Sequence, residues 1–272
     1  MTLRRSKRPV VSIIVITVNT PAITKACIQS ILQNTAVPYE LIVVNNSRAY
    51  GIQKCLKTFP RIKIIRNKKN LGYAKAANQG ATAARGRFLC FLNSDTLVPP
   101  HWMERLLKAA KLPKVGAVSP LSEWETYRRL GPSNIQKATA FTQLTDEAFQ
   151  KWYKNRVKKA RWLSGFCLVI PKAVMLRHGF FDERFFFGWE DIDYSLRLRL
   201  QGYRLLKAAS LFIYHRRGAS SSVKRHRSLV RRAEKAFLSK WSLIFNKKFS
   251  KDREVFAAVD QRESRKPRGA NV

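Results

Sequence analysis

Residues 10–17, Val-Val-Ser-Ile-Ile-Val-Ile-Thr, form an almost continuous run of β-branched and apolar side chains. A run of this length and composition is typical of a strand that is buried on both faces, as the strands of a parallel sheet are. Thr20 and Pro21 follow as a capping residue and a proline at the first helical position, and apolar residues then recur at helical spacing up to Leu32. The segment therefore predicts a strand followed by a helix.

The same unit recurs through the first half of the chain. Further strands are expected at 40–44, 61–65 and 87–92, with helices at 52–59 and 74–84 between them. This alternation predicts an α/β fold with a single, mostly parallel central sheet flanked by helices. Ligands of such sheets bind beyond the carboxyl ends of the strands. The residues that follow the strands are therefore candidates for a binding site, namely 18–19, 45–47 and 93–95.

The charge balance limits the possible partners. The chain has 53 Lys and Arg against 17 Asp and Glu, a formal net charge of +36. Such a field attracts polyanions, so membrane headgroups, acidic glycans and nucleic acid are candidate partners. No apolar stretch approaches the ~20 residues of a transmembrane segment, and the four cysteines lack the spacing of a metal site. These features favour a cytoplasmic protein that can lie at the membrane surface.

Asp95 follows the fourth expected strand, at the end where ligands bind. A carboxylate on this turn can hold Mg²⁺ or Mn²⁺, which would neutralise a diphosphate. The alternative is a helix cap, with Asp95 or Thr96 covering free N–H groups. His215 follows another expected strand and could complete a metal shell beside Asp95, with the arginines after it binding diphosphate oxygens. A structural histidine is the alternative there.

Glu190 and Asp191 open a further expected helix, where the helix dipole favours their ionised form. An ionised carboxylate is what a general base needs to take a proton from an attacking hydroxyl. Ordinary acidic residues of a first helical turn are the alternative interpretation. Asp193 is expected to pair with Arg197, four positions further on.

Six motifs, in this order, resemble those of family 2 (GT2) glycosyltransferases, in the branch that includes rhamnosyl- and galactofuranosyltransferases. Each is weak by itself, and their order and spacing over roughly residues 10–245 make the resemblance specific. They are Val11-Ser-Ile-Ile-Val-Ile-Thr-Val-Asn19, Asn70-Leu-Gly-Tyr-Ala-Lys-Ala-Ala-Asn78, Leu92-Asn-Ser-Asp-Thr96, Phe181-Asp-Glu-Arg-Phe-Phe186, Trp189-Glu-Asp-Ile-Asp193 and His215-Arg-Arg-Gly-Ala-Ser220.

The resemblance implies a GT-A (nucleotide-diphosphosugar transferase) fold and an inverting, metal-dependent transfer of a sugar from a nucleoside-diphosphate sugar to an acceptor hydroxyl. It implies that Asp95 and His215 hold Mg²⁺ or Mn²⁺ and that Asp191 is the base. Glu190 would contact the acceptor or orient Asp191. The residues implied in binding the nucleotide sugar are Thr17, Asn19, Asn45, Asn70, Gly72, Asn78, Asn93, Ser94 and Arg217.

The resemblance also sets the expected domain organisation. The catalytic domain would cover 10–222, after a basic tail at 1–9. Its nucleotide-binding half would be 10–112, its acceptor-binding and catalytic half 162–222, and the polar, aromatic segment 113–161 an insertion between them. Amphipathic helices at 223–247 and a flexible tail at 248–272 would follow.

Three positions depart from the family pattern. Val18 replaces a residue that is often aromatic, and Asn45 replaces an aspartate that usually reads the nucleotide base. Because of these two changes, the sugar donor can contain thymidine or guanosine as well as uridine. Asn93 replaces the first aspartate of the Asp-x-Asp metal signature, so that Asp95 alone supplies the charge.

Three hypotheses for the partner and function remain. The preferred acceptor is a cell-wall or lipid-linked glycan, with the basic helices near 227–248 on anionic headgroups. The second is nucleic acid, whose bases would stack on Trp124, Tyr127, Trp152 or Tyr153. The third is a non-catalytic polyanion-binding protein on a transferase scaffold, for which Asn45 and Asn93 would be the traces of lost activity.

Overall fold

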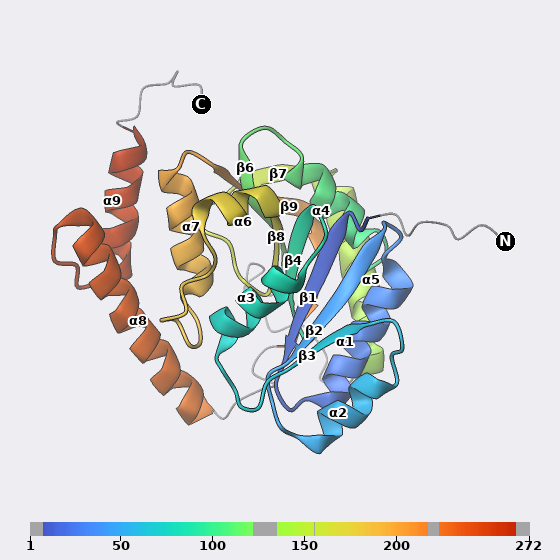
Figure 1. The fold of residues 1–272 in the computed structure, drawn as a ribbon. Helices are drawn as coiled ribbons and strands as arrows, with labels where there is room; N and C mark the ends of the chain where they lie inside the picture. The colour runs from blue at the N-terminus through green and yellow to red at the C-terminus, as the bar shows by residue number, and fades with distance from the viewer. Residues whose placement is uncertain (1–7, 122–134, 155, 217–222, 265–272) are drawn as a thin grey trace.

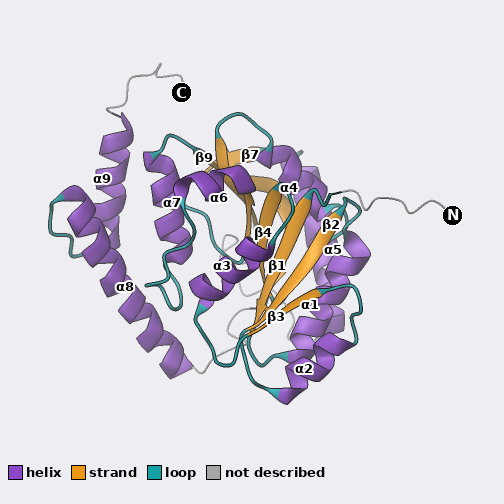
Figure 2. Ribbon diagram, in the orientation of Figure 1, coloured by secondary structure: helices purple, strands orange, loops and turns teal. Residues whose placement is uncertain are grey.

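The structure is a computed structural model that describes residues 8–121, 135–154, 156–216 and 223–264. Within them, one mixed sheet of eight strands is flanked by helices on both faces (Figures 1 and 2). Its strands are β1 Val11–Thr17, β2 Tyr39–Asn45, β3 Lys63–Arg66, β4 Phe88–Asn93, β6 Val115–Leu121, β7 Val157–Lys159, β8 Cys167–Pro171 and β9 Arg204–Phe212. A second, two-stranded sheet consists of β5 Thr96–Leu97 and β10 Tyr214–His215.

The helices cover both faces and one end of the large sheet. The helices are α1 Pro21–Asn34, α2 Tyr50–Lys57, α3 Tyr73–Ala83, α4 Trp102–Ala110, α5 Ile135–Tyr153, α6 Lys172–His178, α7 Glu190–Leu200, α8 Val223–Phe245 and α9 Asp252–Ser264. The last two, α8 and α9, lie beyond α7 at the side of the molecule (Figure 1).

The strand order is β3-β2-β1-β4-β8-β6-β9-β7, in which β1 to β4 are parallel and β8 runs against its neighbours β4 and β6. The expected α/β class with a mostly parallel central sheet is confirmed. In the register of β1, Thr17 lies opposite Asn45 and Ile16 lies opposite Asn93. The carboxyl ends of β1, β2 and β4 therefore meet at one edge of the sheet.

The core explains why β1 has its apolar sequence. All seven residues of β1 are buried, and successive side chains point to opposite faces of the sheet. Ile13 and Val15 pack in a core with residues of α1, α2 and α4, whereas Ile14 and Ile16 pack in a core with residues of α3, α6 and α7. The prediction of a strand buried on both faces is confirmed.

Residues 113–161 differ from the expected insertion. They contribute β6, β7 and α5, and β6 lies inside the sheet between β8 and β9. Because Gly116 and Pro120 are uncommon in strand interiors, the residue pattern of β6 did not predict a strand. Among the aromatic residues considered for base stacking, Trp152 is exposed and Tyr153 is partly buried, whereas positions 124 and 127 lie outside the described residues.

The end of the chain also differs from expectation. In place of a flexible tail after residue 247, residues 252–264 form α9, which packs against α7 and α8. Val255 and Val259 are fully buried, and Arg199 of α7 pairs with Asp260 at 2.5 Å and with Glu263 at 2.6 Å. Only the fold brings these partners together, because Arg199 lies far away in the sequence.

Candidate active site

The turn after β4 places Asn93 and Asp95 beside His215. Strands β5 and β10 pair antiparallel, with His215 opposite Thr96, and the backbone N–H of Arg216 donates to the carbonyl of Asp95 at 2.9 Å. Nε2 of His215 consequently lies 3.1 Å from Oδ1 of Asp95 and 3.2 Å from Nδ2 of Asn93. The fold thus brings together two sequence motifs that lie far apart in the chain.

The surroundings of Asp95 and His215 favour an ionised carboxylate. Their side chains are only 15% and 12% exposed. Burial acts to raise the pKa of Asp95, but the hydrogen bond and charge of His215, with the charge of Arg216, hold this pKa below its ordinary value. Phe166 stacks on the imidazole, with ring centroids 5.2 Å apart at 14°. His215 Nδ1 is buried without a hydrogen-bond partner among the described residues.

These side chains fit a divalent cation that is shared with a ligand. The described residues contain no cluster of three or more His, Cys, Asp or Glu side chains able to hold a metal. Mg²⁺ in nucleotide sites commonly takes one or two carboxylates, with phosphate oxygens and water completing its shell. Asp95 offers a carboxylate, His215 an imidazole nitrogen, and the Asn93 amide can present its oxygen after a half-turn. The donor set therefore fits Mg²⁺ or Mn²⁺ together with a diphosphate.

Glu190 and Asp191 begin α7, as expected. The preceding backbone turns sharply, with positive φ at Gly188 (82°) and Trp189 (73°). The Asp191 carboxylate accepts a hydrogen bond from the N–H of Gly165 at 2.6 Å and another from the N–H of Ile192 at 2.8 Å. Glu190 is 6% exposed, and its Oε2 has no partner among the described residues.

Burial outweighs the helix dipole at these two acids. Burial and the charge of Asp191 raise the pKa of Glu190 to about 8. Burial also raises the pKa of Asp191, although the backbone N–H groups of Gly165 and Ile192 oppose the shift. The start of a helix predicts the ionised form of both acids; burial in the structure instead raises the pKa of both and favours a protonated Glu190 beside Asp191.

Gly165 and Phe166 connect the two groups of side chains. Gly165 donates to Asp191, while Phe166 stacks on His215 and its carbonyl accepts the N–H of Asn93 at 2.8 Å. Asp191 and the Asp95–His215 pair are thus bound to adjacent residues of one short segment. A Cβ atom at position 165 would lie 3.1 Å from Cβ of Asp191 and 3.2 Å from its Oδ2. Only glycine allows this close approach without displacement of the acid.

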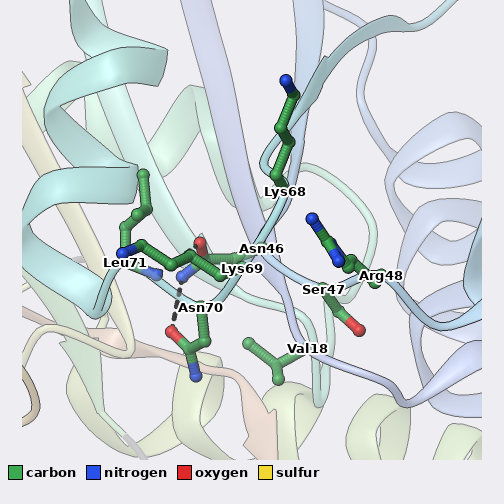
Figure 3. Close-up of a pocket in the computed structure, with 8 residues that line it drawn as sticks. All are labelled: Val18, Asn46, Ser47, Arg48, Lys68, Lys69, Asn70 and Leu71. Atoms are coloured by element: carbon green, nitrogen blue, oxygen red, sulfur yellow. Dashed lines mark hydrogen bonds between the residues drawn. The ribbon is translucent and has the colours of Figure 1, made fainter.

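A pocket of about 570 Å³ opens beyond the ends of β1, β2 and β3. Figure 3 shows the side chains around it, three of them cationic and none acidic. Arg48, Lys68 and Lys69 were not among the predicted site residues, although their position just after β2 and β3 was a signal that could have identified them. The lining residues are Val18, Asn46, Ser47, Arg48, Lys68, Lys69, Asn70 and Leu71.

Asn46 fixes the loop on one side of this pocket. Its Nδ2 donates to Oδ1 of Asn70 at 2.9 Å (Figure 3) and to the carbonyl of Gly72 at 3.1 Å. Its Oδ1 accepts the N–H of Leu71 and the amide of Asn67, both at 3.0 Å. All these contacts lie within the protein, so Asn46 holds the wall of the pocket. The motif identified Asn70 and Gly72, and Asn46 lies in the segment 45–47 that was expected at the site, but its role as an anchor was not predicted.

The other residues predicted to bind the nucleotide differ in their surroundings. The Thr17 hydroxyl contacts that of Thr24 at 2.7 Å, and Asn45 Oδ1 accepts the N–H of Ser47 at 3.2 Å. The Asn78 amide is paired with the backbone of Phe181, at 2.9 and 3.1 Å. These three side chains have protein partners. Two further residues have a positive φ, namely Asn19, which is exposed, at 49° and Gly72 at 85°. Ser94 is partly buried, and Arg217 lies outside the described residues.

Comparison with known proteins places the chain in a family. Residues 12–185 match the family model described as glycosyl transferase family 2. Over 224 residues the chain is 30% identical to the O-antigen biosynthesis protein RfbC of Myxococcus xanthus, covering 78% of this chain but 18% of that protein. Over 214 residues it is 25% identical to the N-acetylglucosaminyl-diphospho-decaprenol L-rhamnosyltransferase of Mycobacterium tuberculosis, covering 69% of each.

Solved structures agree with the fold. The mannosyltransferase PcManGT of Pyrobaculum calidifontis, solved with GDP-Man and Mn²⁺, superposes with a TM-score of 0.64 at 17% identity, over 95% of this chain and 70% of that one. Fold and site define a glycosyltransferase of the GT-A type. The chain belongs to glycosyl transferase family 2. None of the described helices is both long and apolar enough to cross a membrane.

Proposed function

We propose that the protein transfers a sugar from a nucleoside-diphosphate sugar to an acceptor hydroxyl, with inversion at the anomeric carbon. One observation carries the proposal. The half-buried carboxylate of Asp191 and the Asp95–His215 pair are fixed to the adjacent residues Gly165 and Phe166. This arrangement supports a site in which Asp191 serves as the base and the Asp95–His215 pair would hold a cation that neutralises the leaving diphosphate.

In the proposed reaction the acceptor oxygen forms a bond to the anomeric carbon, and the bond from that carbon to the diphosphate oxygen breaks. The acceptor proton passes to the carboxylate of Asp191. The raised pKa of Asp191 suits this role, since a base is most effective when its pKa approaches the working pH. Glu190, protonated near neutral pH, can donate a hydrogen bond to the acceptor or to Asp191.

Asp95 and His215 would hold Mg²⁺ or Mn²⁺, assisted by the Asn93 amide. When bound, such a cation neutralises the negative charge on the leaving diphosphate. We assign nucleotide binding to residues 10–112 and acceptor binding and catalysis to 162–222. The pocket beside Arg48, Lys68 and Lys69 would receive the nucleotide. None of the residues that line this pocket carries a carboxylate. This lining agrees with a sugar donor that contains thymidine or guanosine as well as with one that contains uridine.

For the acceptor we propose a cell-wall or lipid-linked glycan. This assignment rests on the relatives, whose names refer to O-antigen biosynthesis and to a diphospho-decaprenol-linked sugar. The chain covers only 18% of RfbC, so the whole-protein role of that relative is not carried over.

A donor screen tests the proposal. The full chain is incubated with Mn²⁺ and UDP-, dTDP- and GDP-sugars, and released nucleoside diphosphate and glycosylated product are measured by mass spectrometry. We expect turnover with at least one donor, and a loss of about a hundredfold or more in Asp95→Asn and Asp191→Asn. Nucleotide binding by calorimetry should survive in Asp191→Asn. Wild-type turnover in both variants would contradict the assignment.

A further inference from the structure

Helix α8 packs its inner face on the segment that carries the two acids. A Cβ atom at Gly188 would lie 3.9 Å from Cγ2 of Val230. The rings of Trp189 and Phe237 have centroids 4.7 Å apart, and Nε1 of Trp241 donates to Oδ1 of Asp193 at 3.2 Å. Figure 1 shows α8 on the outer side of α7. The helix therefore forms the wall next to Glu190 and Asp191.

The opposite face of α8 is cationic and exposed. Arg227, Arg231, Arg232 and Lys235 are all exposed, and none forms an ion pair with a carboxylate of the described residues. Between Val223 and Phe245 the sequence has a single acidic residue, Glu234. Because 3.6 residues make a turn, these four side chains follow one side of the helix. We refer to this surface as the basic face of α8.

The basic face lies at the same edge of the sheet as the proposed active site. His215 belongs to the site, and α8 begins at Val223, shortly after it. The three arginines lie in the first half of α8, which also contains Val230, the residue that a Cβ atom at Gly188 would meet, and Lys235 follows directly after this half. The cationic surface therefore lies on the outer side of the helix that packs beside the segment bearing Asp191.

The remaining exposed residues favour a lipid surface over nucleic acid. Leu243 is 79% exposed and lies on the same side as Arg232, since eleven residues make about three helical turns. A cationic helix face with an exposed leucine is typical of helices that lie in a membrane interface. The aromatic side chains Phe237 and Trp241 are fully buried, so they cannot stack on nucleic-acid bases.

We propose that the basic face of α8 docks the protein on an anionic phospholipid bilayer and so presents the acceptor to Asp191. The inference deepens the proposed function and rests on it for the location of the acceptor. Phosphate headgroups would pair with Arg231, Arg232 and Lys235, and Leu243 would enter the interface.

The test measures binding of the full chain to phosphatidylcholine vesicles with and without phosphatidylglycerol, by sedimentation at increasing salt. We expect binding only to the anionic vesicles. The triple variant Arg231→Gln/Arg232→Gln/Lys235→Gln should weaken it about a hundredfold, and Leu243→Ser should weaken it several-fold. The matched control Lys108→Gln/Lys111→Gln/Lys114→Gln removes equal charge from exposed residues before β6, at the opposite edge of the sheet, and should change binding little.

Two results would overturn the proposal. Equal losses in the two triple variants would show that net charge alone attracts the protein to the vesicles. Retention of a DNA fragment that depends on the basic face, with vesicle binding unaffected by Leu243→Ser, would identify nucleic acid as the partner.

Donor hydrolysis without vesicles separates this inference from the proposed function. It should be unchanged in the α8 triple variant, and its absence from a wild type that still binds vesicles would contradict the proposed function alone.

Discussion

The ammonium group of Lys240 on α8 lies 2.6 Å from Oδ1 of Asp193 on α7. Asp193 has no exposed side-chain surface, and it also accepts hydrogen bonds from Arg197 at 2.9 Å and from Trp241 at 3.2 Å. The predicted pairing of Asp193 with Arg197 is confirmed. Since Asp193 lies two positions after Asp191, these contacts join α8 to the turn of α7 that bears the proposed base.

Lys240→Met should lower the free energy of unfolding by about 3 kcal/mol or more, because it leaves Asp193 buried with one cation fewer. Urea unfolding at neutral pH measures the change. Lys235→Met is the control, since Lys235 is exposed on the same helix. Equal urea midpoints for the wild type and Lys240→Met would show that Arg197 and Trp241 are enough to stabilise the buried carboxylate of Asp193.

Glu190→Gln should alter the pH dependence of stability. The pKa of Glu190 is raised by burial and by Asp191 to about 8, above the ~4.3 of an unfolded glutamate. Between these values the folded protein holds a proton that the unfolded chain has lost, so stability falls as pH rises through this range. Glu190→Gln removes this pH dependence and should be more stable than the wild type at the upper end of this pH range. Urea unfolding at several pH values measures it, and parallel pH profiles would contradict the raised pKa.

Gly165→Ala should lower turnover more than nucleotide affinity. The added Cβ atom would contact the Asp191 side chain at 3.1 to 3.2 Å, which displaces the proposed base while the pocket near Asn46 is unchanged. We expect kcat to fall about tenfold or more with little change in calorimetric binding of the nucleoside diphosphate. Gly51→Ala is the control, because its Cβ would meet only Pro21, at an ordinary 3.7 Å. Equal kcat in the wild type and Gly165→Ala would exclude this positioning role.

His215→Gln should weaken the apparent affinity for Mn²⁺. Removal of the imidazole leaves Asp95 as the one strong donor of the proposed metal site, so the Mn²⁺ concentration for half-maximal activity should rise about tenfold or more. Titration of turnover with Mn²⁺ measures this shift. His101→Gln serves as the control because the His101 side chain is 77% exposed. An unchanged Mn²⁺ requirement would show that His215 does not bind the cation.

The sequence by itself determined the features that depend on neighbouring residues. The apolar run of β1 and the alternation with α1 predict the buried parallel strands. Polar residues directly after strands, such as Asp95, predict the edge at which the site lies. The order of the six motifs along the chain resembles glycosyl transferase family 2, and the model of that family matches residues 12–185. The first two signals lie within a few residues of chain, where periodicity and spacing express local structure, and the third lies in the order of short motifs along the sequence.

Only the tertiary structure decided the features that depend on residues far apart in the sequence. The approach of Gly165 to Asp191, the burial that raises the pKa of Glu190 and the anchoring of the pocket loop by Asn46 all require the assembled fold. The same holds for α9, whose order depends on partners such as Arg199. Such contacts follow from packing and desolvation, which no local residue pattern contains.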